Sequence, residues 1–192
     1  MNVNIVLFDD FETMDAFGPA QIFGKIPEHF HLNYLSVNGG IINSSQGVKV
    51  WTEILIPREV EDILLVPGGR GARKVLCLEQ EMLNILKESA KEASACMMIG
   101  NGSAVLAQTG LLYRRRIADY PGEENWKRMF TAGIVRESGA GWVSDGKYYS
   151  SSCTMAGIDM TLGVISDLVD PDVAVRAARS IGYDWDQQLE YL

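Results

Sequence analysis

The hydrophobic positions of this chain follow two patterns that alternate along the sequence. Short apolar or alternating runs predict β-strands, and apolar residues spaced three or four positions apart predict amphipathic helices. The short runs predict strands at residues 2–8, 30–37, 48–54, 63–66, 95–99 and 147–150. The helical spacing predicts helices near residues 14–23, 78–93, 103–108 and 154–169.

Strands that alternate with helices predict an α/β fold. Such β-α units form a mostly parallel sheet with helices on both faces. The 192 residues suffice for one substantial core, so we expect residues 1–192 to form a single domain. Ligand sites in open sheets lie beyond the carboxyl ends of the strands. The segments expected to carry function are therefore residues 9–15, 67–71, 100–102 and 150–154.

Composition narrows the classes of partner. The net charge of −8 argues against a nucleic-acid partner, and we interpret the basic run at residues 114–116 as a solvated loop or a local anion contact. No apolar stretch is long enough for a membrane partner, and the N-terminus carries acidic residues where a signal peptide is positive. We expect a cytoplasmic protein that binds a small molecule.

The cysteines argue against a structural disulfide or metal site. Their number is odd, and their spacing matches no paired metal motif. We expect neither a metal nor a cofactor. The three residues are Cys77, Cys96 and Cys153.

Four stretches together carry a family signature in order along nearly the whole chain. They are LFDDFETMDAFGPAQIF (7–23), ILLVPGGRG (63–71), GSAVLAQTGLL (102–112) and SSCTMAGIDMTL (151–162). These stretches resemble the ThiJ/PfpI superfamily of class I glutamine amidotransferase-like proteins, nearest to its isocyanide (isonitrile) hydratase branch. The resemblance implies a flavodoxin-like three-layer sandwich and a homodimer.

The family's nucleophile position holds a glycine in this chain. In members with known chemistry, the strand-to-helix turn reads roughly Ser-Val-Cys-Thr-Gly, and its cysteine attacks the substrate. Residues 98–102 here read MIGNG, so the resemblance aligns Gly100 with the cysteine. Glycine accepts the dihedral angles of a sharp turn without strain but has no atom that attacks carbon. The resemblance therefore implies a preserved turn without thiol chemistry.

A second family motif has also changed. The hydratase branch commonly carries Ala-Thr-Thr-His-Trp after the helix, and the resemblance aligns it with residues 117–121. Tyr120 stands at the histidine position. We expect Asp119 and Tyr120 to line the rim of the pocket.

Several polar groups of the family's site are retained. Asp15 matches the carboxylate that the hydratase branch uses in acid/base chemistry. Burial of this carboxyl group would raise its pKa and let it transfer a proton near neutral pH. The alternative is that Asp15 only stabilises the first helix. Gly68 and Gly69 match the family's oxyanion hole, together with the amide of Asn101 at the helix that begins at Gly102. The alternative is that these glycines only permit a tight turn.

Two cysteines are candidates to replace the missing nucleophile. Cys96 lies in a buried strand and is interpreted as a core residue. Cys153 follows a strand at the same end of the sheet and is a possible rim residue, although no histidine accompanies it to generate a thiolate. A structural role is the alternative for Cys153. The acidic end, residues 183–192, is interpreted as a solvated or interface segment.

Three functions follow from this reading. The chain is a family member without the nucleophile that binds a small polar or anionic metabolite. Alternatively, it is a hydratase, hydrolase or lyase without covalent catalysis, in which Asp15 is the general acid/base. The third possibility is an interaction or sensor protein, because some amidase-like domains of the superfamily belong to AraC-type regulators.

Overall fold

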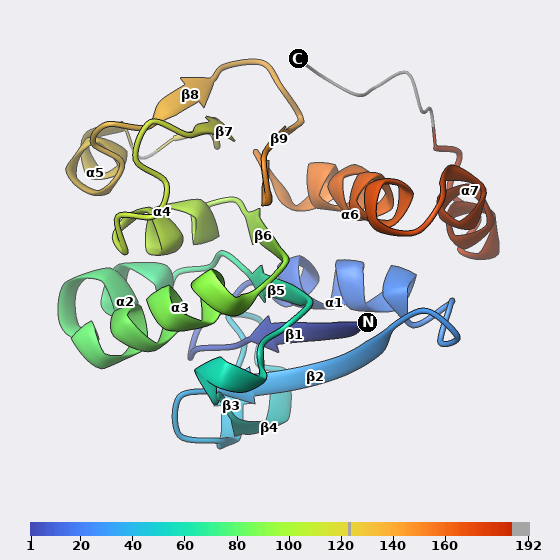
Figure 1. Cartoon of the computed structure of the whole chain (residues 1–192). Coiled ribbons are helices and arrows are strands. Elements are labelled where there is room, and N and C mark those ends of the chain that lie inside the picture. Colours follow the sequence, from blue (N-terminus) through green and yellow to red (C-terminus); the bar gives the residue numbers. More distant parts are fainter. Residues whose placement is uncertain (123, 186–192) are drawn as a thin grey trace.

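An eight-stranded sheet forms the centre of the computed structural model, which describes residues 1–122 and 124–185 (Figure 1). Its strands are β1 (Asn2–Val6), β2 (His31–Ser36), β3 (Gly40–Asn43), β4 (Lys49–Ile54), β5 (Ile63–Val66), β6 (Ala95–Ile99), β9 (Trp142–Asp145) and β10 (Tyr148–Ser151). Their order is β3-β4-β2-β1-β5-β6-β10-β9. The neighbours from β4 to β10 are parallel, and the edge strands β3 and β9 are antiparallel to their neighbours.

Helices cover both faces of this sheet (Figure 1). They are α1 (Thr13–Phe23), α2 (Ala72–Leu78), α3 (Gln80–Glu92), α4 (Gly102–Ala107), α5 (Glu124–Phe130), α6 (Thr154–Leu168) and α7 (Pro171–Ser180), with a 3₁₀ turn at Pro57–Glu59. Helices α1, α6 and α7 contact one another, and α2, α3 and α4 form the other group. A separate parallel pair consists of β7 (Arg116–Ala118) and β8 (Val135–Glu137). The predicted flavodoxin-like α/β sandwich is therefore confirmed.

The central strands occupy the residues that the sequence predicted. Every residue of β5 and β6 is buried, because both faces of the central sheet are covered by helices. Cys96 lies in this core, where burial raises its pKa to about 12. Its interpretation as a core residue is confirmed.

Some elements differ from the prediction. The expected helix at 78–93 is α3, which begins only at Gln80 because Glu79 has non-helical dihedral angles (φ −114°, ψ 65°). Helix α2, which ends at Leu78, was not predicted. Helix α7 was missed although its start carries recognisable signals: Asp170 caps it by accepting a hydrogen bond from Asp172 N, and Pro171 follows. The other elements missed were β3, β7, β8, β9 and α5.

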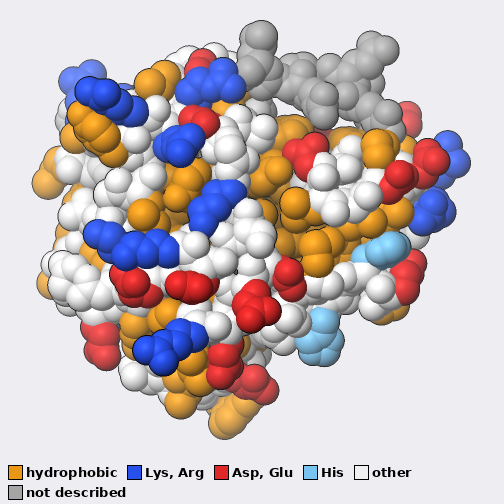
Figure 2. Space-filling view, in the orientation of Figure 1, with side chains coloured by type: hydrophobic (Ala, Val, Ile, Leu, Met, Phe, Trp, Pro, Cys, Tyr) orange, Lys and Arg blue, Asp and Glu red, His pale blue; other side chains and the backbone are white. Residues whose placement is uncertain are grey.

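The surface carries exposed apolar side chains near the start of two helices. Figure 2 shows hydrophobic side chains gathered over α1 and α6. Met14 in the first turn of α1 and Met155 in the first turn of α6 are both exposed. Within the described part of the chain, no helix has the length and apolar character needed to cross a membrane.

The acidic end was interpreted as a solvated or interface segment. Its residues 186–192 lie outside the described residues.

Candidate functional site

The turn between β6 and α4 is held by three backbone contacts. Gly100 N donates to Ser151 O at 3.0 Å, and Ser103 donates to Gly100 O through its amide (3.2 Å) and its hydroxyl (2.8 Å). Gly100 has φ 53°, the left-handed region that glycine adopts without cost from a Cβ atom. A Cβ built on Gly100 would have one heavy atom within 4 Å outside its chain neighbours, which is Asp15 Oδ2 at 3.9 Å. The position of this Cβ is therefore open and faces a carboxyl group.

Asp15 joins three segments that are distant in the sequence. It lies in the first turn of α1 with 4% of its surface exposed. Its Oδ2 accepts from Gly68 N at 3.0 Å, and its Oδ1 accepts from Thr154 Oγ1 at 2.7 Å. The alternative that Asp15 only stabilises the first helix does not account for these contacts, because its carboxyl group connects α1 to the β5–α2 loop and to α6.

The environment of Asp15 changes its acidity. Burial raises the pKa of Asp15 from the ordinary 3.8 to about 6, because the charged form loses its hydration. The hydrogen bonds from Thr154 and Gly68 lower the pKa, and the nearby charge of Glu12 raises it further. A carboxyl group with this pKa can gain or lose a proton near neutral pH.

The two glycines after β5 do not present free amides. Gly68 N donates to Asp15, and Gly69 N donates to Asn101 Oδ1 at 2.8 Å. Asn101 also donates from Nδ2 to Gly69 O at 3.1 Å, so its side chain pairs with both polar groups of Gly69. This corrects the expected oxyanion hole: the glycine amides are occupied by side chains of the site itself. The alternative, a tight turn, agrees with Gly69 at φ 134°.

Gly102 permits a close approach between two elements. A Cβ on this first residue of α4 would lie 2.5 Å from Val66 O and 2.7 Å from Pro67 O. Such distances require the backbone to shift, so a side chain is excluded here. Gly102 therefore allows α4 to begin directly against the carboxyl end of β5.

Two of the expected rim residues belong to a different cluster. Lys127 is fully buried, and its Nζ contacts Asp119 Oδ1 at 2.9 Å and Tyr120 O at 2.7 Å. Arg136 and Glu124 complete the ion pairs of this cluster. Asp119 and Tyr120 thus anchor α5, and no atom of either lies within 4 Å of the Cβ position at Gly100. Their place at the rim of the pocket stays a prediction.

Cys153 lies next to the site in the sequence. It is exposed and occupies the N-cap position of α6, directly before Thr154. The sequence placed the segment 150–154 at the site but gave Thr154 no role. The available signal was its position, immediately after a strand at the carboxyl edge of the sheet.

We predict that Thr154→Val raises the pKa of Asp15, whereas Thr154→Ser leaves it nearly unchanged. The valine variant removes the hydroxyl that stabilises the carboxylate, and the serine variant keeps it. Carboxyl ¹³C chemical shifts followed against pH would measure both values. Equal pKa values in the two variants would contradict the role given to the Thr154 hydroxyl.

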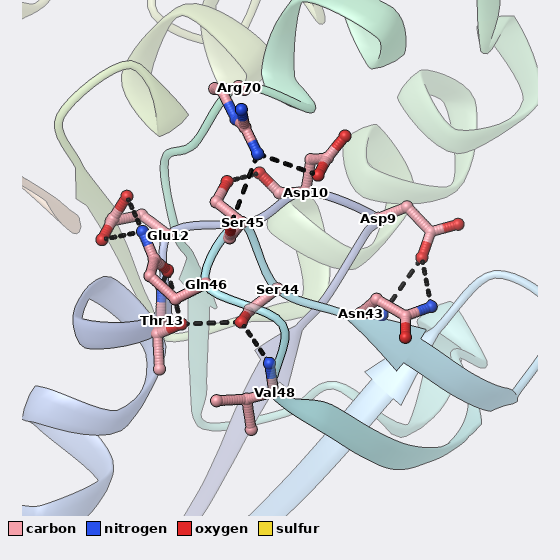
Figure 3. A network of polar contacts seen from close by, with 10 residues as sticks. All are labelled: Asp9, Asp10, Glu12, Thr13, Asn43, Ser44, Ser45, Gln46, Val48 and Arg70. Carbon is pink, nitrogen blue, oxygen red and sulfur yellow. Dashed lines mark hydrogen bonds and ion pairs between the residues drawn. The ribbon is translucent and has the colours of Figure 1, made fainter.

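A polar network fixes the loop that leads into α1 (Figure 3). Gln46 Nε2 donates to both carboxylate oxygens of Glu12, at 2.9 and 3.0 Å. Thr13 Oγ1 donates to Ser44 Oγ at 2.7 Å, so the β3–β4 connection holds the start of the helix that carries Asp15. The charged side chains of this loop are exposed but pair with neighbours, including Asp10, which pairs with Arg70 at 3.5 Å.

The site contains polar groups suited to hydrogen bonding. Within residues 1–122 and 124–185, no group of three His, Cys, Asp or Glu side chains is arranged to hold a metal ion.

Comparison with known proteins extends these observations to a family. A family model described as the DJ-1/PfpI family matches residues 1–167. The chain belongs to the DJ-1/PfpI family. An isonitrile hydratase of Pseudomonas putida is 25% identical over 185 residues, which are 95% of this chain and 78% of that protein. A deglycase of Pyrococcus abyssi is 30% identical over 156 residues, which are 79% of this chain and 89% of that protein.

Solved structures of this superfamily have a similar fold. A DJ-1 superfamily protein of Salmonella typhimurium has a TM-score of 0.83 at 20% identity, covering 96% of this chain and 99% of that one. At this identity the likeness shows the fold alone. The resemblance to the ThiJ/PfpI superfamily is confirmed, with an isonitrile hydratase among the relatives.

Proposed function

We propose that this DJ-1/PfpI-family protein lacks a cysteine nucleophile and binds a small polar molecule between Asp15 and Gly100. The observation that carries the proposal is the buried Asp15 carboxyl group, whose Oδ2 faces the open Cβ position of Gly100. The turn that would hold a nucleophile keeps its left-handed conformation. A ligand group can therefore occupy the place that a side chain leaves free.

The charges of the site favour a neutral ligand over an anionic one. Asp15 is mostly ionised above pH 6 and repels an anion at short range. The amide of Gly69, which would attract an anion, already donates to Asn101. A small carboxamide fits better, because its N–H groups can donate to Asp15 Oδ2.

A second candidate function is acid/base catalysis without a covalent intermediate. It is favoured by the pKa of Asp15, which lies close enough to neutral pH for the group to accept and return a proton. Hydratase, hydrolase and lyase reactions require such a group. Asp15→Asn would abolish turnover by a catalyst of this kind while leaving the fold intact.

The binding proposal predicts that acetamide at pH 8 shifts the backbone NMR signals of Gly68, Gly100 and Thr154. We expect roughly millimolar affinity, because so small a ligand makes few contacts. Acetate, which has the same size but a negative charge, is expected to cause no such shifts. Mapping both probes on the ¹⁵N-labelled protein makes the comparison.

A variant at the open position provides the control. Gly100→Ala places a methyl group in the proposed ligand space and should weaken acetamide binding. Gly182→Ala introduces a side chain at a similar left-handed φ of 71°, where nothing lies within 4 Å, and should leave binding unchanged. The binding proposal fails if acetate binds as well as acetamide or if the two alanine variants behave alike.

A further inference from the structure

A cleft opens at the carboxyl ends of β1 and β2, apart from the Asp15 site. Its volume is about 540 Å³, which lies within the range of small-molecule sites. Neither Asp15 nor Gly100 lines it. Its apolar lining comes from both the sheet edge and the pair of helices α2 and α3: Leu7, Phe8, Val37, Ile42, Val75 and Met82.

The charged residues of this cleft leave an excess of negative charge. Lys74 Nζ lies 3.3 Å from Glu79 Oε1, so these two charges compensate each other. Asp9 and Glu81 also line the cleft and have no compensating cation among its lining residues. The cleft therefore combines an apolar interior with a net negative rim.

The orientation of Asp9 supports a contact with a ligand. Its Oδ1 accepts from Asn43 N at 3.1 Å. In Figure 3 its other carboxylate oxygen points away from Asn43. One oxygen thus fixes the side chain, and the other is available to an ammonium group.

An apolar side chain extends the cleft at its rim. Leu78, the last residue of α2, lines the cleft with 76% of its surface exposed. Leu78 is exposed there because the helical conformation ends at Glu79, between α2 and α3. The apolar body of a ligand would cover Leu78 and gain from removing this surface from water.

We propose that this cleft binds a small organic cation, with an ammonium group facing Asp9 and Glu81 and an apolar body against the lining. A cation is favoured over an anion of equal size by the excess negative charge. The apolar body distinguishes the ligand from a simple inorganic ion. This site is independent of the one proposed around Asp15.

The test uses two probes of similar size and opposite charge, 2-phenylethylammonium and 3-phenylpropionate. We expect 2-phenylethylammonium to shift the NMR signals of Val37, Asn38 and Leu78 in a saturable way, and 3-phenylpropionate to leave them unchanged. Shifts confined to the residues around Asp15, or no saturable shift with either probe, would overturn the proposal. Equal binding of the two probes would overturn it as well.

Variants that change the charge at the exposed rim of the cleft test cation binding without disturbing the fold. Leu78→Lys should weaken 2-phenylethylammonium binding about tenfold more than Leu78→Glu does, because both variants lose the apolar contact and only lysine adds a repelling charge. Both variants change a side chain that lies mostly in water, so the fold is retained. Asp9→Asn should also weaken binding about tenfold while its oxygen still accepts from Asn43 N. Unchanged affinity in Leu78→Lys would contradict the proposed cation site.

Discussion

Asp15→Asn is expected to make the protein more stable than the wild type at pH 8 but to bring little gain at pH 4. The pKa of Asp15 is about 6 in the folded protein, compared with an ordinary value of 3.8. The folded state therefore binds more protons than the unfolded state between these values, and stability falls as the pH rises through this window. From pH 4 to pH 8 this loss amounts to roughly 2 kcal/mol.

Asparagine avoids that loss because it is neutral at every pH in the window. Its amide can still accept one hydrogen bond and donate another in the same pocket. Urea denaturation at pH 4 and pH 8 would give the free energies of unfolding for both proteins. Asp10→Asn is the matched control, since Asp10 lies in the loop that precedes α1 and its side chain is exposed. If the free energy of unfolding changes with pH by the same amount in the wild type and in Asp15→Asn, burial does not destabilise the ionised Asp15 as proposed.

Gly100→Cys is expected to create the most reactive thiol in the protein. The new side chain has room, with Asp15 Oδ2 at 3.9 Å from its Cβ, and lies at the start of α4. The amides of that helix start favour a thiolate. At pH 6 about half of the Asp15 groups are protonated and can donate to the sulfur. We predict alkylation by iodoacetamide at least about tenfold faster than at Cys153.

The left-handed backbone at Gly100 adds a cost to this variant. We expect a loss of roughly 1 kcal/mol in the free energy of unfolding, since a residue with a Cβ is strained at this φ. Gly182→Ala measures the same strain elsewhere. The rate advantage should shrink above pH 7, where ionised Asp15 opposes a second negative charge. Alkylation no faster than at Cys153 at pH 6 would count against a preserved nucleophile turn.

The sequence predicted the parts of the fold that depend on local pattern. The runs of β5 and β6 were recognised because central strands are apolar on both faces. The edge strand β3 was missed because its residues alternate between partly buried and exposed positions over only four residues. The site segments were predicted because parallel strands present their carboxyl ends at one edge.

The contacts inside the site depend on tertiary structure and could not be predicted in the same way. Thr154 meets Asp15 across 139 positions, and nothing in its neighbourhood marks it as a partner. The pairing of Asn101 with Gly69 depends on the orientation of one side chain. Asp119 was expected at the rim because the family motif aligns with residues 117–121. That alignment carries no sign of the ion pair with the buried Lys127, which lies in a polar helix.

The proposed binding site depends most on one feature, a desolvated carboxyl group that faces the open position at Gly100. Its most direct test is a titration of the wild-type Asp15 carboxyl ¹³C signal from pH 3 to pH 9. We predict a midpoint near pH 6, because burial outweighs the hydrogen bonds from Gly68 and Thr154. A midpoint at or below the ordinary 3.8 would contradict it, because Asp15 would then behave as a hydrated or fully stabilised carboxylate.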